Sequence, residues 1–299
     1  MSIASPAVAP PRPATTQKVG LLAGWGRYPI LVAEELRRQG HQTFCLGVKE
    51  HADPRLAAIC DHYEPVGLGK LGRAIRYFNR HEVRDVTMAG KIHKFKLFQP
   101  WMWMKHFPDY RTARRFAQHF LYSTRDRKDD TLLLAVIDEF ALDGIRFAPA
   151  TDFVPELLVK LGNLSRRVPS RTERLDIEFG WNVAKELGRF DIGQCVAVKG
   201  KATLAVEAIE GTDKCIERAG DLCRAGGFTL VKVAKPQQDM RFDVPTIGLG
   251  TLETMVRAGA SCLAVEAGRT IILDQQSTID YANRHGLAIV ALDASGNGA

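Results

Sequence analysis

The sequence lacks three patterns that would each point to a particular class of protein. No stretch reaches the roughly 18 consecutive apolar residues that a membrane-spanning helix needs. The six cysteines form no CxxC pair, so neither a zinc site nor a disulfide framework is indicated, and we expect a protein of the reducing cytoplasm. The eight histidines form neither an HExxH motif nor a Ser-His-Asp pattern, so a nucleophilic triad is not supported.

The 299 residues are 45% hydrophobic and 25% charged, an ordinary globular composition that is long enough for two domains. Residues 1–17 are rich in Pro, Ala and Ser and lack both the basic start and the apolar centre of a secretory signal. We therefore predict a disordered tail at residues 1–17, and a short second tail at residues 294–299.

Positive charge is concentrated in residues 91–128, where ten Lys or Arg residues stand against two Asp residues. The segment also contains nine aromatic residues, including Trp101 and Trp103. Cations beside Trp, Met and Phe suit a membrane interface, because they meet anionic lipid while the rings lie at the apolar boundary. The same mixture suits single-stranded nucleic acid, and an amphipathic helix with aromatic core residues is the structural alternative.

Strand-like and helix-like segments alternate in the first half of the chain, which predicts a parallel sheet with crossover helices, and the second half is also mixed α/β. We predict an α/β protein of two domains: a Rossmann-like domain at 18–147 and a mixed α/β domain at 176–293, with a linker at 148–175. The expected helices lie near residues 29–40, 131–144, 179–188, 212–224, 250–258 and 276–285. The expected strands lie near residues 18–24, 42–48, 194–199, 202–209, 228–234, 261–273 and 287–292, and further segments of the alternation lie near residues 69–80 and 83–90.

A glycine turn containing Gly24 and Gly26 joins the first strand to the first helix. In a βαβ unit such glycines let the backbone turn tightly and bring amide groups toward an anion, so a nucleotide phosphate could bind there. Pro29 replaces the third glycine of the dinucleotide fingerprint, and only Glu50 stands near the place of the ribose-binding acid. A nucleotide-binding oxidoreductase that uses this turn is the alternative function, and a plain turn is the structural alternative.

Seven carboxylates lie between residues 203 and 247, namely Glu207, Glu210, Asp213, Glu217, Asp221, Asp239 and Asp243. Strand alternation places Glu207 and Ile209 on an otherwise apolar face, so Glu207 needs a partner or a cation. Glu210 and Asp213 follow at a strand-to-helix turn, where an acid either binds a metal or caps the helix. The pair Glu217 and Asp221 is predicted to lie on the solvated face of that helix. Further along, Glu266 ends another strand-like run.

A polar loop without hydrophobic periodicity follows the apolar strand that ends near Lys235. Asp239 and Asp243 are predicted to hold Mg²⁺ by oxygen ligation. Lys232, Lys235 and Arg241 are predicted to offset phosphate charge, which is the division of labour that phosphoryl transfer needs. A surface turn with local salt bridges is the structural alternative.

Several stretches resemble one known family: GLLAGWGRYP (20–29), MAGKI (88–92), DDTLL (129–133), DIEFGWNVAKELGRFDIGQCVAVKGKATLAVEAIEGTD (176–213), VKVAKPQQDMRFDVPTIG (231–248) and AVEAGRTIILD (264–274). They resemble the LpxI family, the UDP-2,3-diacylglucosamine pyrophosphatases of lipid A biosynthesis. The likeness runs from about residue 18 to residue 292. At position 237 the chain has Gln where the family usually has Gly.

The resemblance implies Mg²⁺-dependent hydrolysis of the pyrophosphate bond of UDP-2,3-diacylglucosamine to UMP and 2,3-diacylglucosamine 1-phosphate, lipid X. It implies a cytoplasmic enzyme that binds a lipid-linked UDP-sugar and makes transient contact with the inner face of the inner membrane. It implies no nucleic-acid partner, and it leaves open whether the protein forms a homodimer.

The matching motifs also imply roles for individual residues. The implied catalytic residues are Asp239, Asp243, Lys235 and Arg241. The implied substrate-binding residues are Gly24, Gly26, Gly90, Lys91, Asp130, Gln238, Thr212 and Lys232. The implied metal ligands are Glu207, Glu210, Asp213, Asp239 and Asp243.

Overall fold

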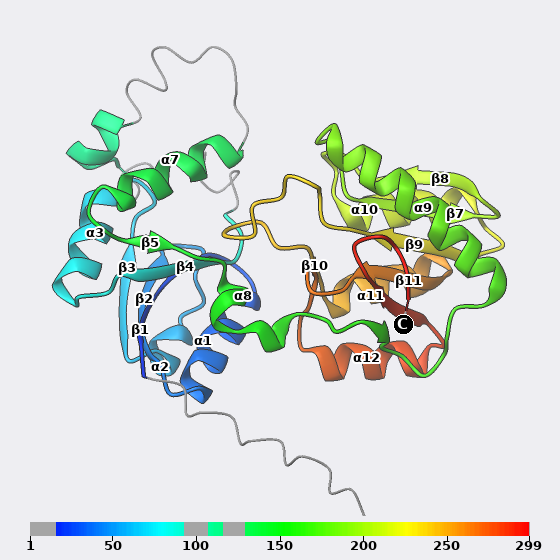
Figure 1. Cartoon of the computed structure of the whole chain (residues 1–299), viewed down its shortest axis with the longest axis horizontal. Helices are drawn as coiled ribbons and strands as arrows, with labels where there is room; N and C mark the ends of the chain where they lie inside the picture. The colour runs from blue at the N-terminus through cyan, green and yellow to red at the C-terminus, as the bar shows by residue number, and fades with distance from the viewer. Residues whose placement is uncertain (1–15, 93–106, 116–128, 299) are drawn as a thin grey trace, which may run out of the picture. The chain divides into compact units, whose positions relative to one another are not determined.

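The computed structural model describes residues 16–92, 107–115 and 129–298. The chain divides into two compact units, Met1–Phe147 and Ala148–Ala299, and each is described by itself. Both units are α/β (Figure 1), as the alternation of segments predicted.

The N-terminal unit is built on a parallel five-stranded sheet in the order β3-β2-β1-β4-β5. The parallel sheet confirms the predicted fold class of this half. Its strands are β1 (Lys18–Ala23), β2 (Gln42–Val48), β3 (His62–Val66), β4 (Asp85–Ala89) and β5 (Arg146–Phe147). Its helices include α1 (Tyr28–Arg38), α2 (Leu56–Ile59), α3 (Leu71–Arg80) and α7 (Asp129–Ala141).

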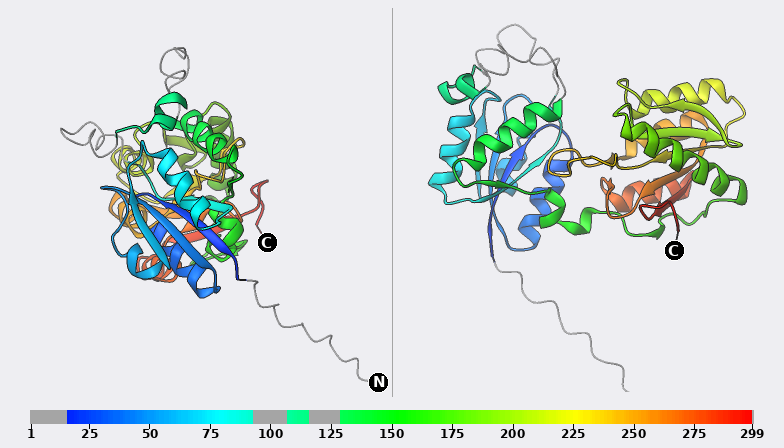
Figure 2. Two further views of the ribbon diagram at one scale, coloured as in Figure 1. Left: turned by 90° about the vertical axis from the view of Figure 1, so that its left-hand side faces the viewer. Right: turned by 45° about the horizontal axis from the view of Figure 1, so that its top comes forward.

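Helix α3 packs closely on the central strand of this sheet. A Cβ atom at Gly20 would lie 2.7 Å from the ring of Phe78, so the missing side chain lets the ring approach β1. Phe78 in turn lies 6.3 Å, between ring centroids, from Phe140 of α7. The aromatic contact joins α3 and α7 on one side of the sheet (Figure 2).

The C-terminal unit contains a six-stranded mixed sheet in the order β6-β13-β11-β9-β7-β8. Strands β9, β11 and β13 are parallel to one another, whereas β7 is antiparallel to both of its neighbours, β8 and β9. The strands are β6 (Gly162–Asn163), β7 (Cys195–Lys199), β8 (Ala202–Val206), β9 (Phe228–Lys232), β11 (Ala260–Glu266) and β13 (Ala288–Leu292). A separate parallel pair is formed by β10 (Thr246–Ile247) and β12 (Ile271–Ile272).

Helices cover both faces of this sheet, because both faces of its strands are apolar. Val196 and Val198 of β7 pack with Trp181 of the long helix α9 in one core. Cys195 and Ala197, the alternate residues, belong to the opposite core, which contains residues of the other helices. The helices are α9 (Arg171–Arg189) on one face and α10 (Thr212–Leu222), α11 (Leu249–Ala258) and α12 (Gln275–Arg284) on the other.

Helix α9 begins at Arg171 rather than near residue 179. Ser170 and Glu173 form a capping box, in which the Ser170 side chain accepts from the Glu173 amide and the Glu173 carboxylate accepts from the Ser170 amide. The segment before it contains α8 (Ala150–Phe153), the 3-10 helix η1 (Pro155–Leu157) and β6. No helix in the described part of the chain is long and apolar enough to span a membrane.

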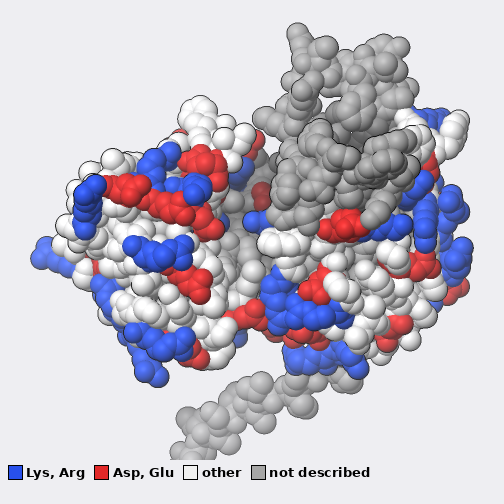
Figure 3. Space-filling view, turned by 180° about the vertical axis from the view of Figure 1, so that it is seen from behind, with Lys and Arg blue, Asp and Glu red and all other residues white. Residues whose placement is uncertain are grey.

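Charged side chains of both signs are interspersed on the face of the C-terminal unit seen in Figure 3. The ion pairs on its surface include Lys214 with Glu217 and Arg189 with Glu186. Arg111, a described member of the predicted basic segment, is paired within its own unit to Glu139. Trp101, Trp103 and most of that segment lie outside the described residues, so the membrane and nucleic-acid interpretations stay predictions.

Candidate functional site

Polar side chains gather at one edge of the C-terminal sheet. Because β8, β9, β11 and β13 run in the same direction, their carboxyl ends meet at this edge. The edge bears Glu207 directly after β8, Lys232 at the end of β9 and Glu266 at the end of β11. All three side chains belong to buried residues. The edge of the sheet therefore brings together acids and bases that are far apart in the sequence.

Glu207 and Lys232 are linked through a hydroxyl group. Thr212, the first residue of α10, donates to Glu207 Oε1 at 2.8 Å and accepts from Lys232 Nζ at 2.9 Å. Lys232 Nζ also donates to the carbonyl of Thr246 at 3.3 Å. The backbone of Gly193 packs directly against that of Glu207, since a Cβ atom at Gly193 would lie 1.9 Å from the Glu207 carbonyl oxygen. The predicted residues Glu207, Thr212 and Lys232 thus form one connected group.

The second oxygen of Glu207 differs from the first. Oε2 is buried and has no hydrogen-bond partner within the described part of the chain. A buried carboxylate oxygen is costly unless a donor or a cation satisfies it. The prediction that Glu207 is buried is confirmed, but Ile209, expected on the same apolar face, is fully exposed because β8 ends at Val206.

Glu210 and Asp213 do not join the group formed by Glu207, Thr212 and Lys232. Glu210 forms a 3.1 Å ion pair with Arg218 of α10. Asp213 is exposed in the first turn of α10, where its charge favourably meets the helix dipole. The N-cap of α10 is Gly211, with φ of 86°, so neither acid caps the helix by a side-chain bond. Glu217 and Asp221 are exposed on α10, which confirms their assignment to its solvated face.

The loop between β9 and β10 is held by its own side chains. The amide of Lys235 donates to Gln238 Oε1 at 2.8 Å, and Gln238 Nε2 donates to Asp243 Oδ2 at 2.7 Å. Gln238 is buried, so these bonds lie beneath the surface of the loop. The Lys235 ammonium forms a 2.7 Å ion pair with Asp191. Three predicted site residues, Lys235, Gln238 and Asp243, therefore lie in one hydrogen-bonded chain.

Asp239 and Arg241 form a separate pair in the same loop. Arg241 Nε donates to Oδ1 of Asp239 at 2.9 Å and to Oδ2 at 3.0 Å. These hydrogen bonds hold the pKa of the Asp239 carboxyl below its ordinary value. Gln237, which takes the usual place of glycine, donates from Nε2 to the Gly188 carbonyl at 2.8 Å and has no positive φ. The position therefore does not need glycine here.

The five acids predicted to bind metal do not form one cluster. In residues 16–92, 107–115 and 129–298, no group of three or more His, Cys, Asp or Glu side chains is arranged to hold an ion. Mg²⁺ is commonly bound by only one or two protein carboxylates, together with water and substrate phosphates. Among the described residues of this unit, two buried carboxylate oxygens lack a hydrogen-bond partner, Glu207 Oε2 and Glu266 Oε1, and only Glu207 is a predicted metal ligand. The Mg²⁺ site stays a prediction.

The glycines of the N-terminal unit lie where its sheet reverses strand order, between β1 and β4. The two turns that follow these strands are paired: Trp25 N donates to the Lys91 carbonyl at 2.8 Å, and Lys91 N donates to the Trp25 carbonyl at 2.9 Å. A Cβ atom at Gly24 would lie 2.8 Å from the Lys91 carbonyl oxygen, and one at Gly90 would lie 2.8 Å from the Gly24 carbonyl carbon. Ligands of open α/β sheets bind at such a switch point.

Gly26 has a φ of 113° and nothing within 4 Å of the place of its Cβ, so glycine is needed there for backbone conformation and not for close packing. Asp130 is the second residue of α7. The structure therefore brings Gly24, Gly90 and Lys91 together. Gly26 belongs to the same turn as Gly24 but does not pack against these residues.

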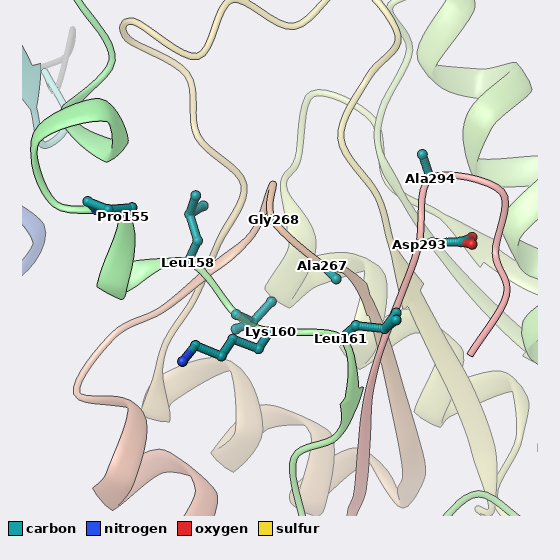
Figure 4. A pocket seen from close by; sticks show the side chains of 9 residues that line it. Pro155, Leu158, Lys160, Leu161, Ala267, Gly268, Asp293 and Ala294 are labelled. Carbon is teal, nitrogen blue, oxygen red and sulfur yellow. The ribbon is translucent and has the colours of Figure 1, made fainter. Parts of the chain in front are cut away.

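A pocket of about 520 Å³ lies beside the carboxyl ends of β11 and β13, which Ala267 and Asp293 directly follow (Figure 4). Leu158 and Leu161 line it together with Ala267 and Ala294. The Asp293 carboxylate beside it accepts from the Ser295 amide. None of the predicted site residues lines this pocket, and its walls are mainly apolar.

Three residues that pair at or near the sheet edge were not among the predicted site residues. Lys185 of α9 donates to Glu266 Oε2 at 2.7 Å, and the same oxygen accepts from the Ala234 amide at 2.8 Å. Glu266 was noticeable as an acid at the end of an apolar strand, but Lys185 looked like an ordinary helix-surface lysine. Asp191, the partner of Lys235, follows α9 and also gave no signal of its own.

Comparison with known proteins accounts for both units. The model of the LpxI N-terminal domain matches residues 18–157, and that of the LpxI C-terminal domain matches residues 160–290. The chain belongs to the LpxI family. It is 32% identical over 289 residues to the UDP-2,3-diacylglucosamine pyrophosphatase LpxI of Caulobacter vibrioides (strain ATCC 19089 / CIP 103742 / CB 15), covering 93% of this chain and 98% of that protein. The family expected from the sequence motifs is therefore confirmed.

Proposed function

We propose that this LpxI family chain hydrolyses the pyrophosphate bond of UDP-2,3-diacylglucosamine in lipid A biosynthesis, releasing UMP and 2,3-diacylglucosamine 1-phosphate. The observation that carries the proposal is the match to a relative of that named activity along almost the full length of both chains. The match to both the N-terminal and the C-terminal domain models of the family also supports it.

The side chains at the sheet edge suit charge handling in phosphoryl transfer. Lys232 and Lys235 supply positive charge to offset developing charge on phosphate oxygens. Asp243, oriented by Gln238, is the acid proposed to hold or accept a proton of the attacking water. Gly24 and Gly90 are proposed to let the backbone approach the nucleotide end of the substrate.

A divalent cation is part of this proposal. Mg²⁺, when bound, would neutralise phosphate oxygens and lower the pKa of a coordinated water. Glu207 is the proposed protein ligand, with water and substrate phosphate oxygens completing the coordination. Thr212 donates to Glu207 and accepts from Lys232, which fixes the orientation of the Glu207 carboxylate.

The proposal is tested with purified protein and UDP-2,3-diacylglucosamine in ¹⁸O-labelled water. We expect release of UMP and of the lipid phosphate, with the label in one of the two products. Asp243→Asn should lower kcat by about 100-fold or more, since an oriented proton acceptor typically contributes 10²- to 10⁴-fold. Asp221→Asn, an exposed carboxylate on α10, is the matched control and should retain wild-type activity. Absence of UMP from the wild-type reaction would refute the proposal.

A dinucleotide-dependent oxidoreductase is the second candidate, favoured by the position of the glycine turn at the switch point. Pro29, in the first turn of α1, stands where that fingerprint has its third glycine. Binding of NAD or NADP would raise the melting temperature of the N-terminal unit. No shift at millimolar dinucleotide would remove this candidate.

A further inference from the structure

Glu266 is a carboxylate completely enclosed by protein at the end of β11. Its Oε2 accepts two hydrogen bonds, from the Ala234 amide at 2.8 Å and from the Lys185 ammonium at 2.7 Å. Its Oε1 is also buried and has no hydrogen-bond partner in the described part of the chain, so the Glu266 carboxylate is held through Oε2 alone. The pair joins helix α9 to the end of a strand 81 residues away in sequence.

Lys185 makes a second bond to the same peptide segment. Its Nζ donates to the Ala234 carbonyl at 3.2 Å, so the N–H of Ala234 is bound by Glu266 while its C=O is bound by Lys185. Lys185 Nζ also lies 5.7 Å from the ring centre of Trp181, a residue of α9 that is buried in the core between this helix and the sheet. Ala234 is therefore held on both of its backbone polar groups by one ion pair.

Ala234 is the last residue before the loop that carries the proposed catalytic residues. The next amide, that of Lys235, donates to Gln238 Oε1, and Gln238 Nε2 donates to Asp243 Oδ2. A continuous series of bonds thus leads from the Lys185–Glu266 pair to Asp243. A displacement of the Ala234 backbone would therefore also displace Lys235, Gln238 and Asp243, because these residues are connected to it through the chain and through hydrogen bonds.

We propose that Lys185 and Glu266 are positioning residues that set the geometry of the loop from Lys235 to Asp243; this rests on the proposed function. Neither residue needs to touch the substrate. Their contribution is to orientation, and misplacement of a reacting group by about 1 Å can cost about 100-fold in rate. Substrate affinity, in contrast, should depend little on them.

The kinetic test uses Lys185→Met and Glu266→Leu, which remove the two bonds to Ala234 while preserving side-chain bulk. We expect kcat for UMP release to fall by about 30- to 100-fold with KM changed by less than about 3-fold. Glu266→Gln keeps an oxygen able to accept both bonds, so it should restore kcat to within about 5-fold of wild type.

The matched control is Glu173→Leu, because Glu173 is also a buried carboxylate paired with a base, Arg167, but it caps the other end of α9. It should destabilise the unit without a comparable loss of kcat. Hydrogen–deuterium exchange of residues 233–243 provides a readout independent of activity: Lys185→Met and Glu266→Leu should speed exchange of this loop, and Glu173→Leu should not.

The two readouts separate the two proposals. If the wild-type chain releases no UMP, the proposed function fails while loop exchange still decides the role of the pair. Unchanged loop exchange in Lys185→Met and Glu266→Leu would overturn the positioning role. It would equally be overturned in an active enzyme by unchanged kcat in both variants, or by an equal loss of kcat in Glu173→Leu.

Discussion

Arg241 holds the Asp239 carboxylate through both of its oxygens. Its Nε lies 2.9 Å from Oδ1 and 3.0 Å from Oδ2, and its backbone amide lies 3.0 Å from Oδ1. The side chains are 32% and 26% exposed, so solvent screens the pair only in part. The pair fixes the direction of Asp239 within the loop and lowers the pKa of its carboxyl.

The lowered pKa of Asp239 predicts a pH-dependent contribution to stability. A carboxyl with a depressed folded-state pKa stabilises the fold above its unfolded pKa of about 3.9, and this stability is lost as the pH falls through the folded pKa. Arg241→Met should therefore lower the free energy of unfolding by about 1 kcal/mol at pH 7, and less below pH about 4. Urea unfolding at several pH values measures this. A difference that stays constant down to pH about 2 would contradict it.

The hydroxyl of Thr212 is predicted to be essential to the group at the sheet edge. Thr212→Val removes the bond to Glu207 Oε1 and the acceptor for Lys232 Nζ. Unfolding free energy should fall by about 1–3 kcal/mol, because two polar groups lose a partner, and UMP release should slow. Thr203→Val, at an exposed position of β8, is the control and should change stability by less than about 0.5 kcal/mol. Equal stability of the two variants would be inconsistent with the bridge.

Removal of divalent cations is predicted to abolish the proposed hydrolysis. EDTA should eliminate UMP release and excess Mg²⁺ should restore it. Glu207→Gln should raise the Mg²⁺ concentration for half-maximal activity by about tenfold or more, because a neutral amide is a weaker ligand than a carboxylate. Glu217→Gln on the exposed face of α10 is the control. Full activity in EDTA would exclude the cation from the mechanism.

Gly90 is predicted to be irreplaceable for two reasons. It has a φ of 93°, and its Cβ would lie 2.8 Å from Gly24 and from Pro29. Gly90→Ala should destabilise the N-terminal unit by about 2–4 kcal/mol, combining backbone strain with overpacking. Gly40→Ala, with a φ of 79° but nothing within 4 Å, isolates the strain and should cost about 1 kcal/mol. Denaturant unfolding compares the two; equal losses would argue against the contact.

The cysteines are predicted to react unequally with alkylating reagents. Burial raises the pKa of the Cys262 thiol to about 12 and also raises the pKa of Cys195, while a hydrogen bond with Cys60, together with burial, raises the pKa of Cys45. Since the thiolate is the nucleophile, these residues should stay unmodified in the native protein at pH 8. Cys223, which is only partly buried, should react first with iodoacetamide. Peptide mass spectrometry in native buffer and in urea measures the order, and early labelling of Cys262 would contradict it.

Much of the fold could be predicted because hydrophobic periodicity is local. The strand at 42–48 was predicted with its observed bounds, since its apolar run is bounded by turn residues. The expected strand at 202–209 was too long, because the chain turns after Val206 and exposes Ile209. The early start of α9 was missed although Ser170 and Glu173 have capping-box spacing.

The candidate site was predicted less completely. The sequence indicated Glu207, Lys232 and the acids of the polar loop, because charged residues stand out at the ends of apolar strands. It could not show that Thr212 links Glu207 to Lys232, or that Arg241 binds Asp239 while Gln238 binds Asp243. These pairings depend on distances of about 3 Å, whereas spacing along a chain specifies only which residues are near neighbours.

By itself the sequence determined the α/β class, the family and the residue types available for phosphate chemistry, because periodicity and motifs are properties of the chain. Only the tertiary structure decided how those residues are paired. The parallel directions of β8, β9, β11 and β13 bring their carboxyl ends to one edge. Because these charged side chains are buried there, each requires a partner. Glu266 forms an ion pair with Lys185 of α9, which is 81 residues away in the sequence.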